Sequence, residues 1–169
     1  MFKYIYLILV GVIPFKIIQM IRKNRLKFYI NKYPNIQKTV SFGVHCVIYG
    51  ARNNVYIGEY TYVNDAHIVA GKKSIVRIGK NCSIGYRVSI KASTHALSKS
   101  FHDENGKHHI IEKDIIIGDR CWLGDGVYIK EGVVLGNDVV VGANAVVTKS
   151  FPNNVVLGGV PAKIIKEYD

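Results

Sequence analysis

Several features that would point to common protein classes are scarce in this sequence of 169 residues. Proline is rare, with 4 residues, whereas glycine is frequent, with 16. This composition favours a β-rich fold with many tight corners over a helical bundle. The cysteines Cys46, Cys82 and Cys121 form no C-x-x-C pair and no metal-ligand spacing. We therefore expect reduced thiols, buried at Cys82 and Cys121, in a single-domain cytoplasmic protein.

Acidic residues are missing from the first third of the chain. Residues 1–58 contain nine Lys or Arg and no Asp or Glu, whereas the rest of the chain holds 14 basic and 12 acidic residues. The excess positive charge therefore belongs to an N-terminal appendage and predicts an anionic surface as partner. Since no motif that reads nucleic acid is present, we predict no nucleic-acid partner and favour a membrane face.

Long apolar runs are also missing. The stretch from Tyr4 to Ile13 ends before Pro14 and Lys16, whereas a membrane-spanning helix needs about 20 apolar residues. Basic residues at positions 22, 23, 25, 27 and 32 follow it. Two interpretations of residues 1–39 stay open. One is a kinked helix in the membrane interface, peripheral on the inner face of the cell membrane, and the other is a helical cap on the end of the fold or on a neighbouring subunit.

What the chain does contain, from residue 55 onward, is a six-residue period. Glycine follows seven of the twelve recurring aliphatic residues, and a compact or aliphatic residue comes four positions after many of them. The recurring aliphatics are Ile57, Val63, Val69, Ile78, Ile84, Ile90, Ile117, Leu123, Ile129, Leu135, Val141 and Val147. The compact positions are Cys82, Val88, Cys121, Val127, Val133, Val139 and Ala145.

This period predicts an all-β solenoid. The two inward positions of each hexad lie at i and i+2, which suits the alternation of a strand, and a period of six does not suit a helix. Corner pairs such as Asp125-Gly126, Asn137-Asp138 and Ala143-Asn144 contain residues that tolerate positive φ. Three strands and three corners make one coil, and about six coils account for residues 40–163, followed by a tail over 164–169.

The period is interrupted by one polar segment over residues 93–113. It contains the turn signal Asn105-Gly106 and is predicted to protrude from the solenoid wall as a loop. His102, His108 and His109 lie in it, but no carboxylate or thiol stands at a metal-binding distance in sequence, so no metal site is predicted.

The hexads over residues 55–166 resemble the hexapeptide-repeat acyltransferases. Residues 114–165, DIIIGDRCWLGDGVYIKEGVVLGNDVVVGANAVVTKSFPNNVVLGGVPAKII, are similar to the sugar O-acetyltransferase branch of that family. The resemblance implies a left-handed parallel β-helix, acetyl-CoA as co-substrate without a metal, and a homotrimer with active sites between subunits.

The same resemblance assigns residues to the reaction. His95, in S-T-H at the start of the loop, matches the general base, a role that suits a side chain that titrates near neutrality. Asn64 matches an asparagine that faces the acceptor, the alternative being a corner residue that holds its own turn. Trp122 matches a wall of the substrate pocket, the alternative being subunit packing. In W-L-G-D, the backbone N–H of Asp125 matches the group that faces the thioester carbonyl.

The C-terminal hexads resemble the CoA-binding end of the family. Ala143 would contact the pantetheine, and Thr148, Lys149, Lys163 and Lys166 would meet the phosphates. A lysine provides a point charge where some relatives have the bidentate fork of arginine. The alternative for each lysine is a solvated basic face.

Outward positions in the later hexads are themselves apolar, which predicts burial between subunits. These positions are Ile116, Trp122, Tyr128, Val134, Val140 and Val146.

We therefore expect an acetyl-CoA-dependent O-acetyltransferase acting on a sugar hydroxyl of a surface polysaccharide or lipid-linked glycan. Three alternatives stay open: an N-acetyltransferase on an amino sugar or nucleotide-linked sugar, a small-molecule acetyltransferase for serine or an antibiotic, and a non-catalytic β-helix.

Overall fold

The computed structural model describes residues 15–95 and 109–168, which form mostly short strands with an N-terminal helix, α2 (Phe15–Lys32). The strands form three sheets of parallel ladders that we name A, B and C. Sheet A contains β3 (Val55–Ile57), β6 (Val76–Ile78), β11 (Ile115–Ile117) and β14 (Val134–Leu135). Sheet B contains β1 (Ser41–Phe42), β4 (Tyr62–Val63), β7 (Ser83–Ile84), β12 (Trp122–Leu123), β15 (Val140–Val141), β17 (Val155–Gly158) and β18 (Lys163–Glu167). Sheet C contains β2 (Val47–Tyr49), β5 (His67–Val69), β8 (Ser89–Lys91), β13 (Tyr128–Ile129) and β16 (Val146–Val147).

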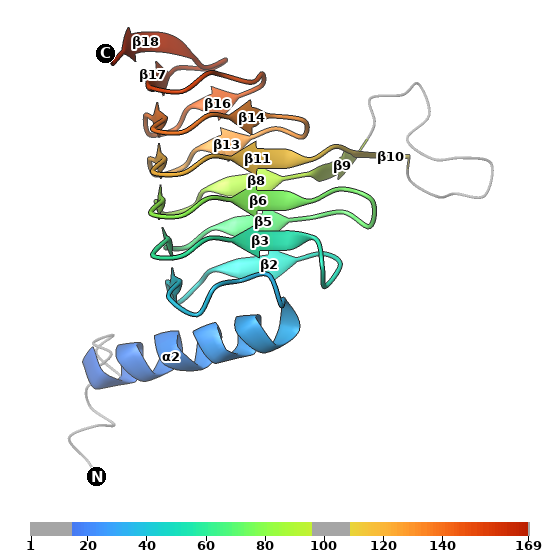
Figure 1. Ribbon diagram of the computed structural model, residues 1–169, viewed down its shortest axis with the longest axis vertical. Helices are drawn as coiled ribbons and strands as arrows, with labels where there is room; N and C mark the ends of the chain where they lie inside the picture. The colour runs from blue at the N-terminus through green and yellow to red at the C-terminus, as the bar shows by residue number, and fades with distance from the viewer. Residues whose placement is uncertain (1–14, 96–108, 169) are drawn as a thin grey trace, which may run out of the picture.

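The chain visits the sheets in the order A, B, C and then starts the next coil, so that the coils stack into a column (Figure 1). Ile117 pairs in parallel with Leu135, eighteen residues later, and Ile129 pairs in the same way with Val147. The last strand differs, because β18 runs antiparallel to β17 and closes the C-terminal end. The segment predicted as a C-terminal tail, 164–169, thus includes most of β18. We call the turn from a sheet-B strand to the next sheet-C strand the B/C corner, and name the A/B and C/A corners likewise.

The core confirms the hexad prediction at nearly every position. The recurring aliphatic and compact side chains fill the interior, with exposed fractions of 1% or less for all but one of those named above. That one is Val69, where the prediction was wrong. Ile68 is the buried residue, and Val69 pairs with Lys91 on the outer side of the wall. The step from the inward Val63 to the inward Ile68 is five residues instead of six, so the inward position shifts by one in β5.

Corner backbone conformations follow the predicted turn residues. Gly126, Asp138 and Asn144 have φ of 71°, 58° and 59°. This left-handed region is inexpensive for glycine and tolerated by Asn and Asp, whose short side chains hydrogen-bond locally. The corner composition thus directs the chain from one sheet to the next.

Helix α2 closes the N-terminal end of the column. Tyr29 and Tyr33 are buried against it, and their hydroxyls donate to the carbonyls of Cys46 and Ile48 at 2.8 and 3.1 Å. The Arg25 guanidinium also donates to the Cys46 carbonyl. Helix α2 therefore packs on the end of the column. Residues 1–14, including Pro14, lie outside the described part. No helix in that part is long and apolar enough to span a bilayer.

The interruption of the repeat leaves the column at the C/A corner after β8. Strands β9 (Ser93–His95) and β10 (Ile110–Glu112) form an antiparallel pair at its base, with Ser93 opposite Glu112 and His95 opposite Ile110. The predicted loop over 93–113 therefore has an ordered stem. Residues 96–108, with Asn105-Gly106, His102 and His108, lie outside the described residues.

Candidate functional site

The stem that carries His95 is fixed to the column at its first residue. Ala92, directly before it, is fully buried. The Ala92 carbonyl accepts hydrogen bonds from the Ser74 hydroxyl at 2.9 Å and from the Lys113 N–H at 3.0 Å. Ser74 is itself buried. The Ala92 carbonyl therefore links the start of the stem to its end and to the coil below. His95 is three residues beyond it, at the exposed end of β9.

The other strand of the stem is held by a carboxylate. Glu112 accepts hydrogen bonds from the backbone N–H groups of Lys72 and Lys73, at 3.2 and 2.5 Å. Because Glu112 pairs with Ser93, these bonds limit the directions in which the His95 strand can tilt. The sequence did not single out Glu112, since its partners are about 40 residues away along the chain.

Side chains at the A/B corners form a ladder of hydrogen bonds to the backbone. The N–H of Lys80 donates to the Asp119 carboxylate at 3.0 Å, that of Asp119 to the Asn137 side chain at 2.8 Å, and that of Asn137 to the Asn153 side chain at 2.8 Å. Each corner N–H thus finds an acceptor on the coil above it. Such pairing is the normal state of backbone donors.

At the B/C corners one hydrogen bond of the same kind is present, and the next one is missing from the described part of the chain. The Tyr86 N–H donates to the Asp125 carboxylate at 2.8 Å. The next residue in this column is Ala143, which has no side-chain acceptor, and within the described residues the Asp125 N–H has no hydrogen-bond partner. Asp125 and Ala143 are both exposed, so this donor lies at the surface. The Asp125 carboxylate thus accepts a hydrogen bond from the corner below.

Asn64 and Trp122 lie beside this column. Asn64 follows β4 at the B/C corner, is half-buried, and donates its N–H to the Ile84 carbonyl at 3.0 Å. Trp122 is 56% exposed on the outer face of sheet B. In the register of that sheet, Tyr62 and Trp122 flank Ser83 from below and above. Sequence reasoning missed Tyr62, although it occupies the same outward hexad position as Trp122.

A groove about 260 Å³ in volume joins this region to the cap. Arg22 of α2 lines it together with Ser41, Tyr62 and Asn64. The Nε of Arg22 is buried, and it has no hydrogen-bond partner among the residues that the structure describes. A buried donor without a partner is costly. The sequence placed Arg22 in the basic cluster and did not connect it with this groove.

The residues predicted to meet the phosphates of CoA lie toward the C-terminal end. Thr148 and Lys149 follow β16 at the C/A corner, while Lys163 and Lys166 lie on β18. All four are exposed. The ammonium groups of Lys149 and Lys166 lie 5.5 and 5.6 Å from the ring centres of Phe151 and Tyr168, which orients both side chains.

Within one chain, the predicted residues fall on two different corners. Asn64, Asp125 and Ala143 stack at the B/C corner, with Trp122 next to them, whereas His95 leaves from the C/A corner. Sheet C separates the two sets. A site that uses both therefore needs the B/C corner of one chain beside the C/A corner of another.

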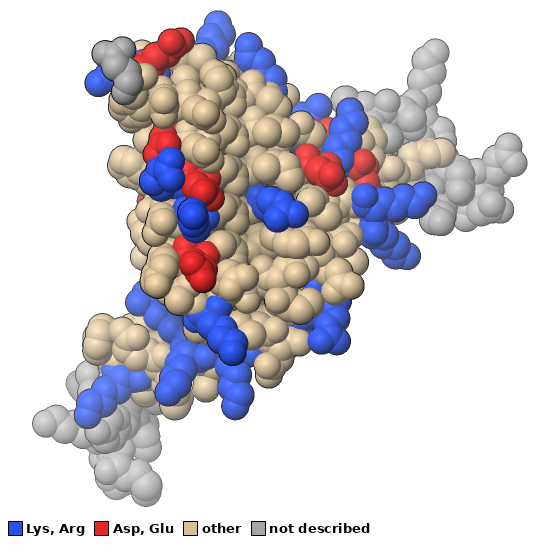
Figure 2. Space-filling view, in the orientation of Figure 1, with Lys and Arg blue, Asp and Glu red and all other residues tan. Residues whose placement is uncertain are grey.

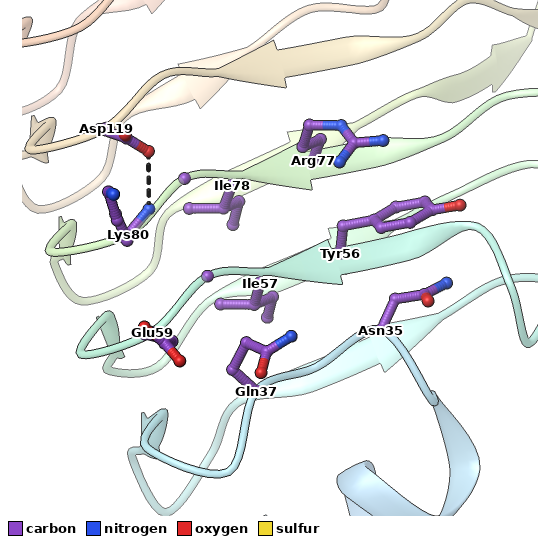
Figure 3. A pocket seen from close by; sticks show the side chains of 11 residues that line it. Asn35, Gln37, Tyr56, Ile57, Glu59, Arg77, Ile78, Lys80 and Asp119 are labelled. Atoms are coloured by element: carbon purple, nitrogen blue, oxygen red, sulfur yellow. Dashed lines mark hydrogen bonds between the residues drawn. The ribbon is translucent and has the colours of Figure 1, made fainter.

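Another groove, about 470 Å³ in volume, lies elsewhere, on the N-terminal part of sheet A (Figure 3). Its lining includes Asn35, Gln37, Glu59 and the pair Tyr56–Arg77, in which the guanidinium lies 4.2 Å from the ring centre. None of the predicted site residues lines it.

Cys46 and Cys121 are unsuited to act as nucleophiles. Burial raises the pKa of the Cys46 thiol to about 12. A hydrogen bond with Cys82 and burial raise the pKa of Cys121 above its ordinary value, and Cys121 also lies 3.1 Å from the Gly136 carbonyl. Among the described residues no group of three His, Cys, Asp or Glu side chains could hold a metal ion.

Comparison with known proteins shows similarity to hexapeptide-repeat transferases. The family model "Bacterial transferase hexapeptide (six repeats)" matches residues 114–149. Two relatives come from Escherichia coli (strain K12). A protein with the provisional name of lipopolysaccharide biosynthesis O-acetyl transferase WbbJ is 36% identical over 126 residues, 70% of this chain and 63% of the relative. Galactoside O-acetyltransferase is 33% identical over 123 residues, 73% of this chain and 59% of the relative. The chain thus spans about three fifths of the length of these relatives.

Solved structures share the architecture. Galactoside acetyltransferase in complex with coenzyme A has a TM-score of 0.65 at 28% identity, covering 86% of this chain and 70% of that one. A maltose O-acetyltransferase from Clostridium difficile 630 has a TM-score of 0.73 at 24% identity, covering 91% and 83%. A GDP-perosamine N-acetyl transferase from Caulobacter crescentus has a TM-score of 0.53 at 24% identity, covering 78% and 53%. The last two likenesses show the fold alone.

Proposed function

This chain carries a hexapeptide-repeat transferase domain, and from that premise we propose that it is an acetyl-CoA-dependent O-acetyltransferase acting on a sugar hydroxyl. The acceptor would belong to a surface polysaccharide or a lipid-linked glycan, a class that fits the lipopolysaccharide biosynthesis in the name of one relative. We further infer that the coils over residues 40–163 wind in the left-handed sense of that family. The observation that carries the proposal is the surface N–H of Asp125 beside Trp122, which has no hydrogen-bond partner among the described residues.

In the proposed reaction the acceptor oxygen attacks the thioester carbonyl carbon while His95 removes the hydroxyl proton. The oxyanion that forms accepts a hydrogen bond from the Asp125 N–H, a fixed donor that needs no reorganisation. The C–S bond then breaks, the new C–O ester bond remains, and His95 returns the proton to the CoA thiolate. The anchored stem below His95 supports this role, because a base must be held within hydrogen-bond reach of the proton it removes.

CoA would extend from the B/C corner toward the C-terminal end. The small Ala143 leaves room for the pantetheine. The exposed Lys163 and Lys166 of the same chain, with Thr148 and Lys149 from the C/A corner of the neighbouring chain, would meet the phosphates. The solvated-face alternative for these lysines remains open. Titration of CoA into variants with each lysine replaced by Gln decides between the two.

We also propose a homotrimer in which each site is shared. His95 would come from the C/A corner of one chain, and Asn64, Trp122, Asp125 and Ala143 from the B/C side of the next. Sheet C, which lies between these corners, would then face the threefold axis. A half-buried Tyr128 and Val146 on its outer surface support that placement. Association with the inner face of the cell membrane completes the proposal.

Thiol release from acetyl-CoA in the presence of a panel of sugars tests the function. His95→Ala should lower the rate by about 10²–10⁴ while CoA binding, measured by calorimetry, is retained. His109→Ala is the matched control, from the same loop, and should behave like the wild type. Wild-type activity that survives in His95→Ala would refute the proposal.

N-acetylation is the second candidate, because the fold is shared with an N-acetyl transferase for a nucleotide-linked amino sugar. The same assay separates the two when each hydroxyl acceptor is paired with its amino analogue. Faster turnover of the amino sugar would favour this candidate.

A further inference from the structure

The outward face of α2 is both basic and apolar. Tyr29 and Tyr33 point into the column, so the opposite side of the helix faces away from it. The residues on that side recur at helical spacing and are all exposed. They are Lys16, Met20, Lys23, Lys27 and Phe28, and we call this set the outer cap face.

Charge is segregated toward this end of the molecule. The first acidic residue of the chain is Glu59, so α2 and the coil next to it contain only positive charges. Figure 2 shows Lys and Arg side chains without Asp or Glu around α2, whereas both signs are mixed higher on the column. Such a field attracts an anionic surface and is not balanced within the described part of the chain.

Exposed apolar side chains on α2 indicate which kind of anionic partner it binds. Phe15, Met20 and Phe28 are 71%, 56% and 57% exposed, among the lysines of the helix. A nucleic-acid backbone offers charge but no apolar layer. The interface of an anionic bilayer offers both, since phosphates meet the lysines and acyl chains accept the rings.

We propose that the outer cap face docks on an anionic phospholipid bilayer, with the column standing upright on it. The helix lies across the end of the column in Figure 1, so a bilayer parallel to α2 lies across the column axis. In a trimer with parallel columns, three such faces would meet the same bilayer, which multiplies their affinity.

This orientation determines how far the candidate site lies from the lipid surface. Together with the proposed function, on which this step rests, that distance indicates the class of acceptor. Strands β2, β5 and β8 are successive neighbours in sheet C, and the His95 stem leaves directly after β8. With about 4.8 Å per coil and a helix about 10 Å across, His95 lies roughly 20 Å above the lipid surface. A glycan carried on a membrane lipid reaches that height with a few sugar units.

Vesicle sedimentation of the full chain tests the docking. The probes are vesicles of phosphatidylcholine alone and of phosphatidylcholine with 30% phosphatidylglycerol, at about 0.1 and 0.5 M salt. We expect binding to the anionic vesicles at low salt only. The variant K16Q/K23Q/K27Q should bind about a hundredfold more weakly. The control K72Q/K73Q/K80Q makes the same change in net charge on the column wall, where these residues are exposed, and should bind like the wild type.

Equal binding to neutral vesicles, equal loss in both triple variants, or binding to duplex DNA in preference to the anionic vesicles would overturn the docking. Acetyl transfer to a soluble sugar, measured in parallel, should be unchanged in the cap variant. Its absence in the wild type would refute the proposed function and leave the docking result standing, so the two failures are distinguishable.

Discussion

At the scale of single residues, the proposed reaction depends on the backbone N–H of Asp125, which has no hydrogen-bond partner among the described residues. Ala143 occupies the position where Asn137 and Asn153, at the other corner, provide an acceptor for the coil below. We predict that the Asn side chain in Ala143→Asn accepts a hydrogen bond from the Asp125 N–H. The melting temperature should stay the same or rise, while the transfer rate falls by about 10²–10³, the usual effect of removing an oxyanion donor.

The control for this substitution is Asn153→Asp, which keeps an acceptor for the Asn137 N–H at a corner without a proposed role. It should leave both rate and melting temperature near the wild-type values. An Ala143→Asn enzyme of full activity would show that the Asp125 N–H does not face the reacting carbonyl.

His67 provides a residue-scale prediction about pH. Burial and, to a lesser extent, the Lys91 ammonium lower the pKa of this imidazole below its ordinary value of 6.5. The unfolded chain therefore binds the proton more readily than the folded one. The resulting contribution to the free energy of unfolding is fully present above about pH 6.5 and is lost as the pH falls through the folded pKa.

We expect the wild type to lose more stability than His67→Gln between about pH 7.5 and pH 5. The difference should be below about 1 kcal/mol, because the ring is only half-buried. Thermal unfolding of both proteins across this range measures it. Parallel stability curves would contradict the assignment.

At the scale of elements, the stem β9–β10 determines where the base can be. Glu112 fixes this stem through the N–H groups of Lys72 and Lys73. We predict that Glu112→Ala lowers kcat by at least about tenfold, since a small displacement of a catalytic group is costly, with the KM for acetyl-CoA unchanged. Glu112→Gln, which keeps an oxygen acceptor, should recover most of the rate. An equal loss in both variants would mean that Glu112 acts by its charge and not by holding the stem.

The elements also show how far the sequence could predict this molecule. The six-residue period predicted nearly all inward residues. It failed at Val69 because the step from Val63 to the buried Ile68 is five residues. The corner ladder was not predictable. The Asp125 acceptor for Tyr86 is 39 residues away, because the interruption separates two coils that are neighbours in space.

The candidate residues divide in the same way. His95, Asp125 and Ala143 were assigned from the resemblance of S-T-H, W-L-G-D and the C-terminal hexads to the hexapeptide-repeat acyltransferases. Glu112, Tyr62 and Arg22 could not be found, since each gains its place through contact with another coil or with the cap.

At the scale of the whole molecule, the proposed trimer explains why one chain separates His95 from the Asp125 N–H by a full sheet. Each site would combine the C/A corner of one subunit with the B/C corner of its neighbour. A closed cyclic arrangement repeats that contact three times. Monomers would then be inactive although every residue is present.

The most direct test is complementation between two inactive subunits. His95→Ala and Ala143→Asn chains, co-expressed with different tags, should form mixed trimers, each with one site that has both groups intact. We predict about a quarter of the wild-type rate for random mixing, against almost none for either variant alone. A mixture no more active than the average of its two parents would contradict the shared site.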